Sequence, residues 1–63
     1  MKIFEKTCKC IEDLEFNGYL FHKGREYQVD IYPLFYKVYQ NGGWYDYAIL
    51  TQEEFDKNFE IIA

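Results

Sequence analysis

The chain has 63 residues, enough for a single domain spanning residues 1–63, and 22% of them are aromatic. A domain of this size buries only about 60% of the surface that its unfolded chain exposes, so we expect large rings to fill its core. The net charge of −4 and the pI near 4.8 argue against nucleic-acid binding by phosphate neutralisation, which requires clustered Lys and Arg.

The N-terminal segment, residues 2–12, is predicted to form a strand, because its side chains alternate loosely between the two faces. One side carries Phe4, Cys8 and Cys10, and the other carries Glu5, Thr7 and Lys9. Asn17-Gly18 then marks a tight turn or a loop tip. The stretch before it is acidic and contains Glu12, Asp13 and Glu15.

The clearest strand pattern spans residues 26–31 and follows a turn signal at Lys23-Gly24. Tyr27, Val29 and Ile31 alternate with Glu26, Gln28 and Asp30. This period of two predicts a strand with one face buried and the other face, including Asp30, in water.

Residues 33–49 are predicted to form a hairpin. Pro33 ends the preceding strand or begins a connector, and the segment from Phe35 to Tyr39 is rich in residues that favour strands. Asn41-Gly42 supplies the positive φ angles that a tight hairpin requires. The residues from Trp44 to Ile49 then form the return strand.

The C-terminal segment predicts a short helix from Gln52 to Asn58. Thr51 and Glu54 have the spacing of a capping box, in which each side chain accepts a hydrogen bond from the other residue's backbone amide. Phe55 and Phe59 are four residues apart and therefore share one helix face. Residues 60–62 are expected to add a closing strand.

The predicted order is strand, loop, strand, strand, hairpin turn, strand, short helix and short strand. An open meander of this size would expose two edge strands, and closure into a small barrel removes most of that exposure. We therefore predict a mostly-β fold, a five-stranded SH3-like barrel with one short helix before the last strand. An OB-like or α+β sheet arrangement is the alternative.

A pattern that covers most of the chain consists of the Cys-rich first strand, Phe21-x-x-Gly24-x-x-Tyr27-x-Val29, Tyr36-x-Val38-Tyr39, Gly43-Trp44-Tyr45 and Glu54-Phe55-x-x-x-Phe59. It resembles short proteins of phages and prophages of low-GC Gram-positive bacteria, which are predicted to be SH3-like barrels. The resemblance rests on packing and turn residues, so it transfers no catalytic or binding residue. It implies a viral or mobile-element origin and an accessory protein that binds host factors, including components of antiviral defence.

Cys8-Lys9-Cys10 is the first candidate for chemistry. Both sulfur atoms would lie on one face of a strand. A zinc site usually needs a second pair of ligands, and His22 is the only other obvious ligand. We therefore expect both thiols to pack in the core, with no metal and no cofactor.

The sequence contains no residue set that supports an enzyme. His22 is the only histidine, its neighbours Lys23 and Arg25 are basic, and the chain has no Ser, so a base paired with a nucleophile is not evident. Two acidic clusters, at residues 12–15 and 53–60, would need a cleft to act as paired carboxylates. We expect His22 in a loop and the acidic residues on solvated faces, where they aid solubility, meet a basic partner or mimic nucleic acid.

The aromatic residues are the most informative candidates for binding. The core is expected to take Tyr27, Val29, Val38 and Phe55, but it cannot hold all of Tyr32, Phe35, Tyr39, Trp44, Tyr45 and Tyr47. Trp and Tyr are enriched at binding hot spots, and SH3 domains grip proline-rich peptides with such rings. We predict a binding site at the aromatic hairpin beside the acidic segments, formed by Tyr36, Tyr39, Trp44, Tyr45, Tyr47, Glu12, Asp13 and Glu15. The competing interpretation is that these rings only cover a small core.

Three functions are compatible with these patterns. The first is a phage-type module that binds a host or viral protein, for example as an inhibitor of a defence enzyme. The second is a homo-oligomeric structural protein that associates through residues 32–39 and its edge strands. The third is nucleic-acid binding through stacked rings, as in OB-folds, which the acidic pI opposes. Because no run of 18 apolar residues and no signal peptide is present, we expect a cytoplasmic protein in the bacterial host.

Overall fold

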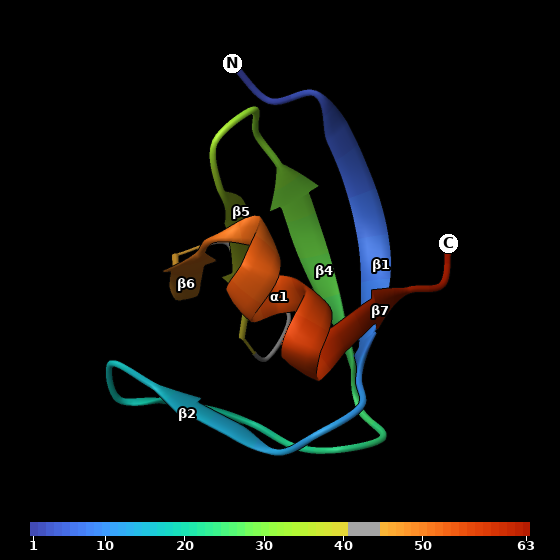
Figure 1. Cartoon of the computed structure of the whole chain (residues 1–63), viewed down its shortest axis with the longest axis vertical. Coiled ribbons are helices and arrows are strands. Elements are labelled where there is room, and N and C mark those ends of the chain that lie inside the picture. Colours follow the sequence, from blue (N-terminus) through green and yellow to red (C-terminus); the bar gives the residue numbers. More distant parts are fainter. Residues whose placement is uncertain (41–44) are drawn as a thin grey trace.

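A computed structural model describes residues 1–40 and 45–63 (Figure 1). Seven strands and one helix follow one another along the chain. They are β1 (Phe4–Cys10), β2 (Leu14–Phe16), β3 (Tyr19–Phe21), β4 (Glu26–Ile31), β5 (Tyr36–Tyr39), β6 (Tyr47–Leu50), α1 (Gln52–Asn58) and β7 (Phe59–Ile61). The mostly-β class and the short helix before the last strand are therefore confirmed.

Five of the strands form one antiparallel sheet in the order β6-β5-β4-β1-β7. The long connection between β1 and β4 contains the second sheet, the β2-β3 hairpin, which lies across the lower end of the structure in Figure 1. Among the described residues, β6 and β7 do not pair with each other, so the sheet is open between them. α1 connects these two edge strands along the chain and lies between them in Figure 1.

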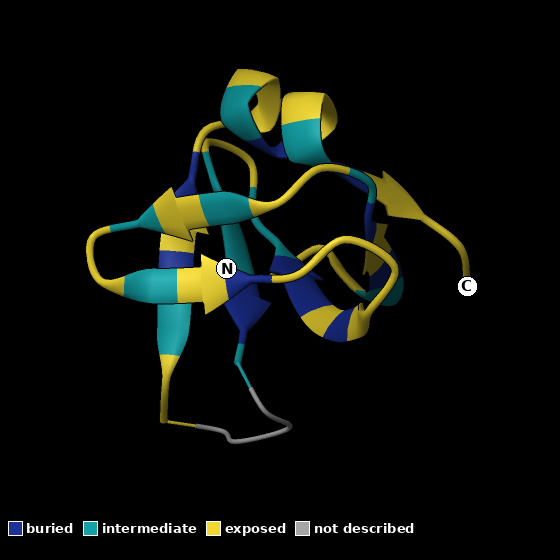
Figure 2. Cartoon of the chain, turned by 90° about the horizontal axis from the view of Figure 1, so that it is seen from below, coloured by how far each residue is buried: buried dark blue, intermediate teal, exposed yellow. Residues whose placement is uncertain are grey.

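The core lies between the five-stranded sheet and a cover made by α1 and the β2-β3 hairpin. In Figure 2 the buried part of α1 is on its underside, toward the strands. Phe21 of the hairpin meets Tyr27 and Phe59 edge to face, with ring centroids 5.0 and 5.3 Å apart, an arrangement that aromatic pairs prefer. The four residues predicted for the core, Tyr27, Val29, Val38 and Phe55, are all buried.

The predicted turn at Asn17-Gly18 is confirmed. Both residues have positive φ angles, 51° and 86°, as the tightest hairpin turns require. Each flanking strand has only three residues, which is too few for an alternation of buried and exposed side chains to be recognised. The sequence therefore predicted a loop at this position. Leu14, Phe16 and Tyr19 pack against the core, so the hairpin closes one end of the sheet.

The predicted helix and its capping box are also confirmed. The Glu54 amide donates to Thr51 Oγ1 at 3.1 Å, and the Thr51 amide donates to Glu54 Oε1 at 2.9 Å. Phe55 and Phe59 are both buried and stack with centroids 5.2 Å apart. After Asn58 the chain becomes extended, and β7 pairs with β1 as the expected closing strand. The described residues form no helix with the length and apolar character needed to cross a membrane.

The predicted pairing of β5 with β6 is confirmed, but the return strand begins later than expected, at Tyr47 instead of Trp44. Beyond β5 and β6 the pairing continues by one residue on each strand, because the Gln40 amide donates to the Asp46 carbonyl at 2.8 Å. The Asn41-Gly42 turn and Trp44 lie outside the described residues. Register places Tyr47, and not Trp44, opposite Tyr39.

Candidate binding surface

Strand alternation gives β5 and β6 two different faces. Val38, Ala48 and Leu50 point into the core and are buried. The intervening residues Lys37, Tyr39, Tyr47 and Ile49 therefore lie on the opposite side of the sheet, in two cross-strand pairs, Lys37 with Ile49 and Tyr39 with Tyr47. We call these four residues the outer face.

Lys37 lies between two aromatic rings. Its Nζ is 5.0 Å from the ring centroid of Tyr32 and 4.6 Å from that of Tyr47, within the range of cation–π attraction. Tyr32 in turn stacks on Phe35, with centroids 4.6 Å apart and ring planes 14° apart. These contacts hold the long lysine side chain in place and put a positive charge in the middle of an aromatic surface.

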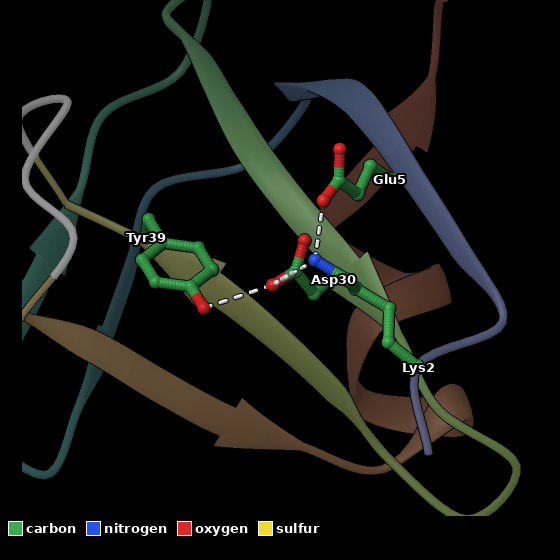
Figure 3. Close-up of polar contacts among 4 residues, drawn as sticks. All are labelled: Lys2, Glu5, Asp30 and Tyr39. Atoms are coloured by element: carbon green, nitrogen blue, oxygen red, sulfur yellow. Dashed lines mark hydrogen bonds and ion pairs between the residues drawn. The ribbon is translucent and has the colours of Figure 1, made fainter.

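Asp30 corrects the sequence analysis, which placed this residue in water. It is only 7% exposed, because Tyr39 and the N-terminal segment cover it (Figure 3). The Tyr39 hydroxyl donates to Asp30 Oδ2 at 2.9 Å, and Lys2 Nζ lies 3.6 Å from the same oxygen. Lys2 also pairs with Glu5. A carboxylate that would be costly to bury alone is thus hydrogen-bonded and paired with a cation.

The surroundings of Asp30 shift the titration of both of its partners. Burial, and next the hydrogen bond that it donates to Asp30, raise the pKa of Tyr39 to about 12. The hydrogen bond to Glu5, together with the nearby Asp30, raises the pKa of Lys2. At neutral pH Tyr39 is therefore a proton donor and Lys2 a cation, which are the forms that stabilise the Asp30 carboxylate.

The free edge of the sheet runs along the outer face. Because Gln40 and Asp46 form a hydrogen-bonded pair, hydrogen-bonded and non-hydrogen-bonded pairs must alternate from there along β5 and β6. Tyr47 and Ile49 fall in the non-hydrogen-bonded pairs, so their amides and carbonyls point away from β5. Within residues 1–40 and 45–63 no strand occupies that side of β6. The Ile49 side chain is also 50% exposed.

The structure brings together only part of the predicted aromatic site. The rings of Tyr39 and Tyr47 are 5.4 Å apart, although Tyr39 is 8% exposed. Tyr36 belongs to the inner face, where it stacks on Phe55 at 4.6 Å. Tyr45 precedes β6 and is 92% exposed, and the predicted role of Trp44 lies outside the described residues.

The acidic part of the predicted site belongs to other elements. Glu12 and Asp13 lie between β1 and β2, and Glu15 lies in β2; all three are exposed. Asp13 Oδ1 accepts a hydrogen bond of 2.6 Å from the Lys23 amide, which ties the two ends of the hairpin together. This contact gives Asp13 a structural role, and none of the three residues belongs to the outer face.

Both cysteines have the predicted core position. Cys8 and Cys10 are buried and unpaired, and the Cys10 thiol donates to the Glu12 carbonyl at 2.9 Å. Burial, with a smaller effect of Cys10, raises the pKa of Cys8 to about 12, and burial also raises the pKa of Cys10. These thiols are therefore poor nucleophiles at neutral pH. In the described part of the chain, no group of three or more His, Cys, Asp or Glu residues is placed to hold a metal ion.

Three residues of this surface were not predicted as site residues from the sequence: Lys37, Ile49 and Tyr32. Alternation along the predicted hairpin could have placed Lys37 and Ile49 beside Tyr39 and Tyr47, but Tyr32 joins them only through the turn after β4. Comparison with known proteins adds no relative to this description: no protein-family model, curated protein or solved structure matches the chain.

Proposed function

We propose that this chain is a small SH3-like module that binds an extended segment of a partner protein along the free edge of β6. One observation carries the proposal. Tyr47 and Ile49 both direct their backbone amides and carbonyls away from β5, toward the free edge, and both have their side chains on the outer face. An added strand takes its affinity from backbone hydrogen bonds and its specificity from alternate side chains. β6 offers both on one short segment.

The edge also lacks the features that usually prevent strand addition. Protected edge strands carry Lys, Pro or a bulge, whereas β6 has the sequence Tyr-Ala-Ile-Leu and pairs regularly with β5. Lys37 is one strand further in and is held between rings. It can contact an acidic or aromatic side chain of the incoming segment without blocking the backbone.

The strand order supports the SH3-like part of the proposal. A meander of β1, β4, β5 and β6, followed by a short helix and a last strand that returns to β1, is the connectivity that a small closed barrel needs. Closure would require only that the edges β6 and β7 come together around α1. In this proposal the opening between them is where the partner segment binds.

The biological setting rests on the resemblance described for the sequence. We propose a phage or prophage accessory protein whose partner is a host protein, with a component of antiviral defence as the specific case. A 63-residue chain with an exposed strand edge and without evident catalytic residues suits inhibition by occupying a surface of the target.

Affinity capture from a bacterial host lysate, with quantitative mass spectrometry, tests this function. Ile49→Lys adds a charge at the exposed edge, and Ile62→Lys makes the same change at an isoleucine of similar exposure, 43%, outside β6. We expect a protein that is recovered by the wild type and by Ile62→Lys but lost with Ile49→Lys, while circular dichroism shows that all three are folded. Equal recovery by both variants would contradict binding along β6.

Homo-oligomerisation is the second candidate, because β6 is self-complementary. Two antiparallel copies of β6 centred on Ala48 would place Tyr47 of each chain opposite Ile49 of the other and join their outward-facing backbone groups. Such an interface is isologous and closes as a dimer. Sedimentation equilibrium at millimolar concentration decides this point: a wild-type monomer excludes the dimer, and a dimer that Ile49→Lys dissociates supports it.

A further inference from the structure

A cavity lies away from the outer face, where the β2-β3 hairpin meets the sheet. It has a volume of about 260 Å³ and is lined by Gly18, Leu20, His22, Arg25, Tyr27 and Gln40. This is smaller than the roughly 300–1,000 Å³ of sites for drug-sized ligands. It therefore suits a small chemical group better than an extended molecule.

The walls of this cavity come from three parts of the chain that fixed contacts hold together. Gln40, at the end of β5, donates from Nε2 to the Leu20 carbonyl of β3. Tyr27 of β4 is only 8% exposed and is fixed by its edge-to-face contact with Phe21. The His22 amide donates to the Tyr27 hydroxyl at 3.0 Å. The cavity is thus part of the folded framework.

The polar groups around the cavity are mainly hydrogen-bond donors. The Tyr27 hydroxyl uses an oxygen lone pair to accept from His22, and its own proton has no acceptor among the described residues. The guanidinium of Arg25 forms no ion pair there either, and the Gln40 amide nitrogen has a second hydrogen. None of the residues that line the cavity is acidic.

Arg25 is one of four cations, with Lys9, Lys23 and Lys57, that form no ion pair or ring contact among the described residues, and it is the one of these four that lines the cavity. Lys2 is paired with Glu5 and Asp30, Lys6 lies over the Phe4 ring, and Lys37 lies between two rings. Arg25 has no such contact within residues 1–40 and 45–63, and it has the bidentate donor geometry that suits carboxylates and phosphates.

We propose that this cavity binds an oxyanion, a carboxylate or a phosphate group, with Arg25 as the main contact and the Tyr27 hydroxyl as a second donor. The charge of Arg25 compensates that of the ligand, and the Tyr27 hydroxyl, whose proton has no acceptor among the described residues, donates a second hydrogen bond. His22 and Gln40 complete the wall and can each donate a further hydrogen bond. The site is separate from the β6 edge and does not depend on the function proposed there.

Titration of the ¹⁵N-labelled protein tests this inference with sodium acetate in one series and sodium phosphate in another, at constant ionic strength set with sodium chloride. We expect saturable chemical-shift changes at the amides of Gly18 and His22 and at the side-chain nitrogens of Arg25 and Gln40. Tighter binding of acetate indicates an acidic side chain or chain terminus as the natural ligand, and tighter binding of phosphate indicates a phosphorylated one.

Two matched variants distinguish specific binding of the oxyanion in the cavity from nonspecific electrostatic attraction to a positive charge. Arg25→Gln is expected to weaken binding about tenfold or more, because it removes the positive charge and the bidentate donors that bind the oxyanion. Lys57→Gln removes the same charge from α1 and is expected to leave the affinity within about twofold, since exposed charges act weakly at a distance.

Tyr27→Phe isolates the second donor, with Tyr45→Phe as the control at an exposed tyrosine. We expect weaker binding only for Tyr27→Phe, and thermal unfolding confirms that this variant is folded at the titration temperature. Shifts that do not saturate, or equal affinities for the wild type and Arg25→Gln, would overturn the proposal.

Discussion

Replacement of Tyr39 by Phe removes one oxygen atom from the covered side of the outer face. The ring keeps its size, so its contact with Tyr47 at 5.4 Å is expected to persist. The Asp30 carboxylate, 7% exposed, loses the hydrogen bond of 2.9 Å that it accepts from Tyr39. Lys2 Nζ, 3.6 Å from the same oxygen, already pairs with Asp30 in the wild type, so its attraction is not a new compensation for the lost hydrogen bond.

The expected cost follows from the charge of the acceptor. A hydrogen bond to a charged group contributes about 1.5–3 kcal/mol, and leaving a buried charged group unsatisfied increases the loss. We expect Tyr39→Phe to lower the free energy of unfolding by about 2 kcal/mol. For a domain of this size that is a large part of the total, about 3–9 kcal/mol, and it lowers the Tm by about 8–16 °C.

Urea unfolding followed by Trp fluorescence, together with thermal unfolding, measures this loss. Tyr45→Phe, which removes the same atom from a residue that is 92% exposed, is expected to stay within about 0.5 kcal/mol of the wild type. A double-mutant cycle with Asp30→Asn isolates the coupling between the two side chains. If Tyr39→Phe is as stable as Tyr45→Phe, the hydroxyl does not stabilise the buried carboxylate and the reasoning is refuted.

Two further predictions concern the helix cap and the buried thiol. Thr51→Ala should lower the free energy of unfolding, measured in urea, by about 1 kcal/mol. Glu54→Gln keeps an acceptor in the capping box and should change this free energy little. Equal losses in the two variants would exclude the cap as the cause. Because burial raises the pKa of Cys8 from 9.0 to about 12, the unfolded chain releases this proton first, and stability should fall above pH 9 by up to about 1.4 kcal/mol per pH unit. The free energy of unfolding, measured at pH 7, 9 and 10.5, should decline less steeply for Cys8→Ala than for Val38→Ala. Val38→Ala is the control, because it opens a cavity at a fully buried residue without a titratable group. Identical declines would show that the Cys8 thiol does not cause the pH dependence.

Local patterns were sufficient for the parts of the fold that neighbouring residues control. The Thr51–Glu54 box needs only the three-residue spacing of its partners, and the Asn17-Gly18 turn needs only residues that tolerate positive φ. Alternation at residues 26–31 identified Tyr27 and Val29 as core residues, because a strand with one buried face has a period of two.

Alternation failed at Asp30, where the outer face is covered by side chains that arrive from elsewhere. Tyr39 lies nine residues further along the chain and Lys2 lies in the segment before β1, so no local pattern reveals that they meet over this carboxylate. Tyr36 is a different case, because it lies two residues before Val38, a predicted core residue, and alternation therefore places it on the inner face, where it stacks on Phe55 of α1.

The sequence by itself determined the class of the fold, the position of the helix and its cap, most strand positions and the aromatic core, because each depends on spacing within a few residues. Tertiary structure alone decided which strands are the edges of the sheet, which aromatic rings meet Lys37, and that the acidic segment and the aromatic hairpin belong to different surfaces. It also placed Arg25 and Tyr27 around one cavity. These features depend on strand order and on contacts between residues far apart in the chain, which an alternating pattern does not specify.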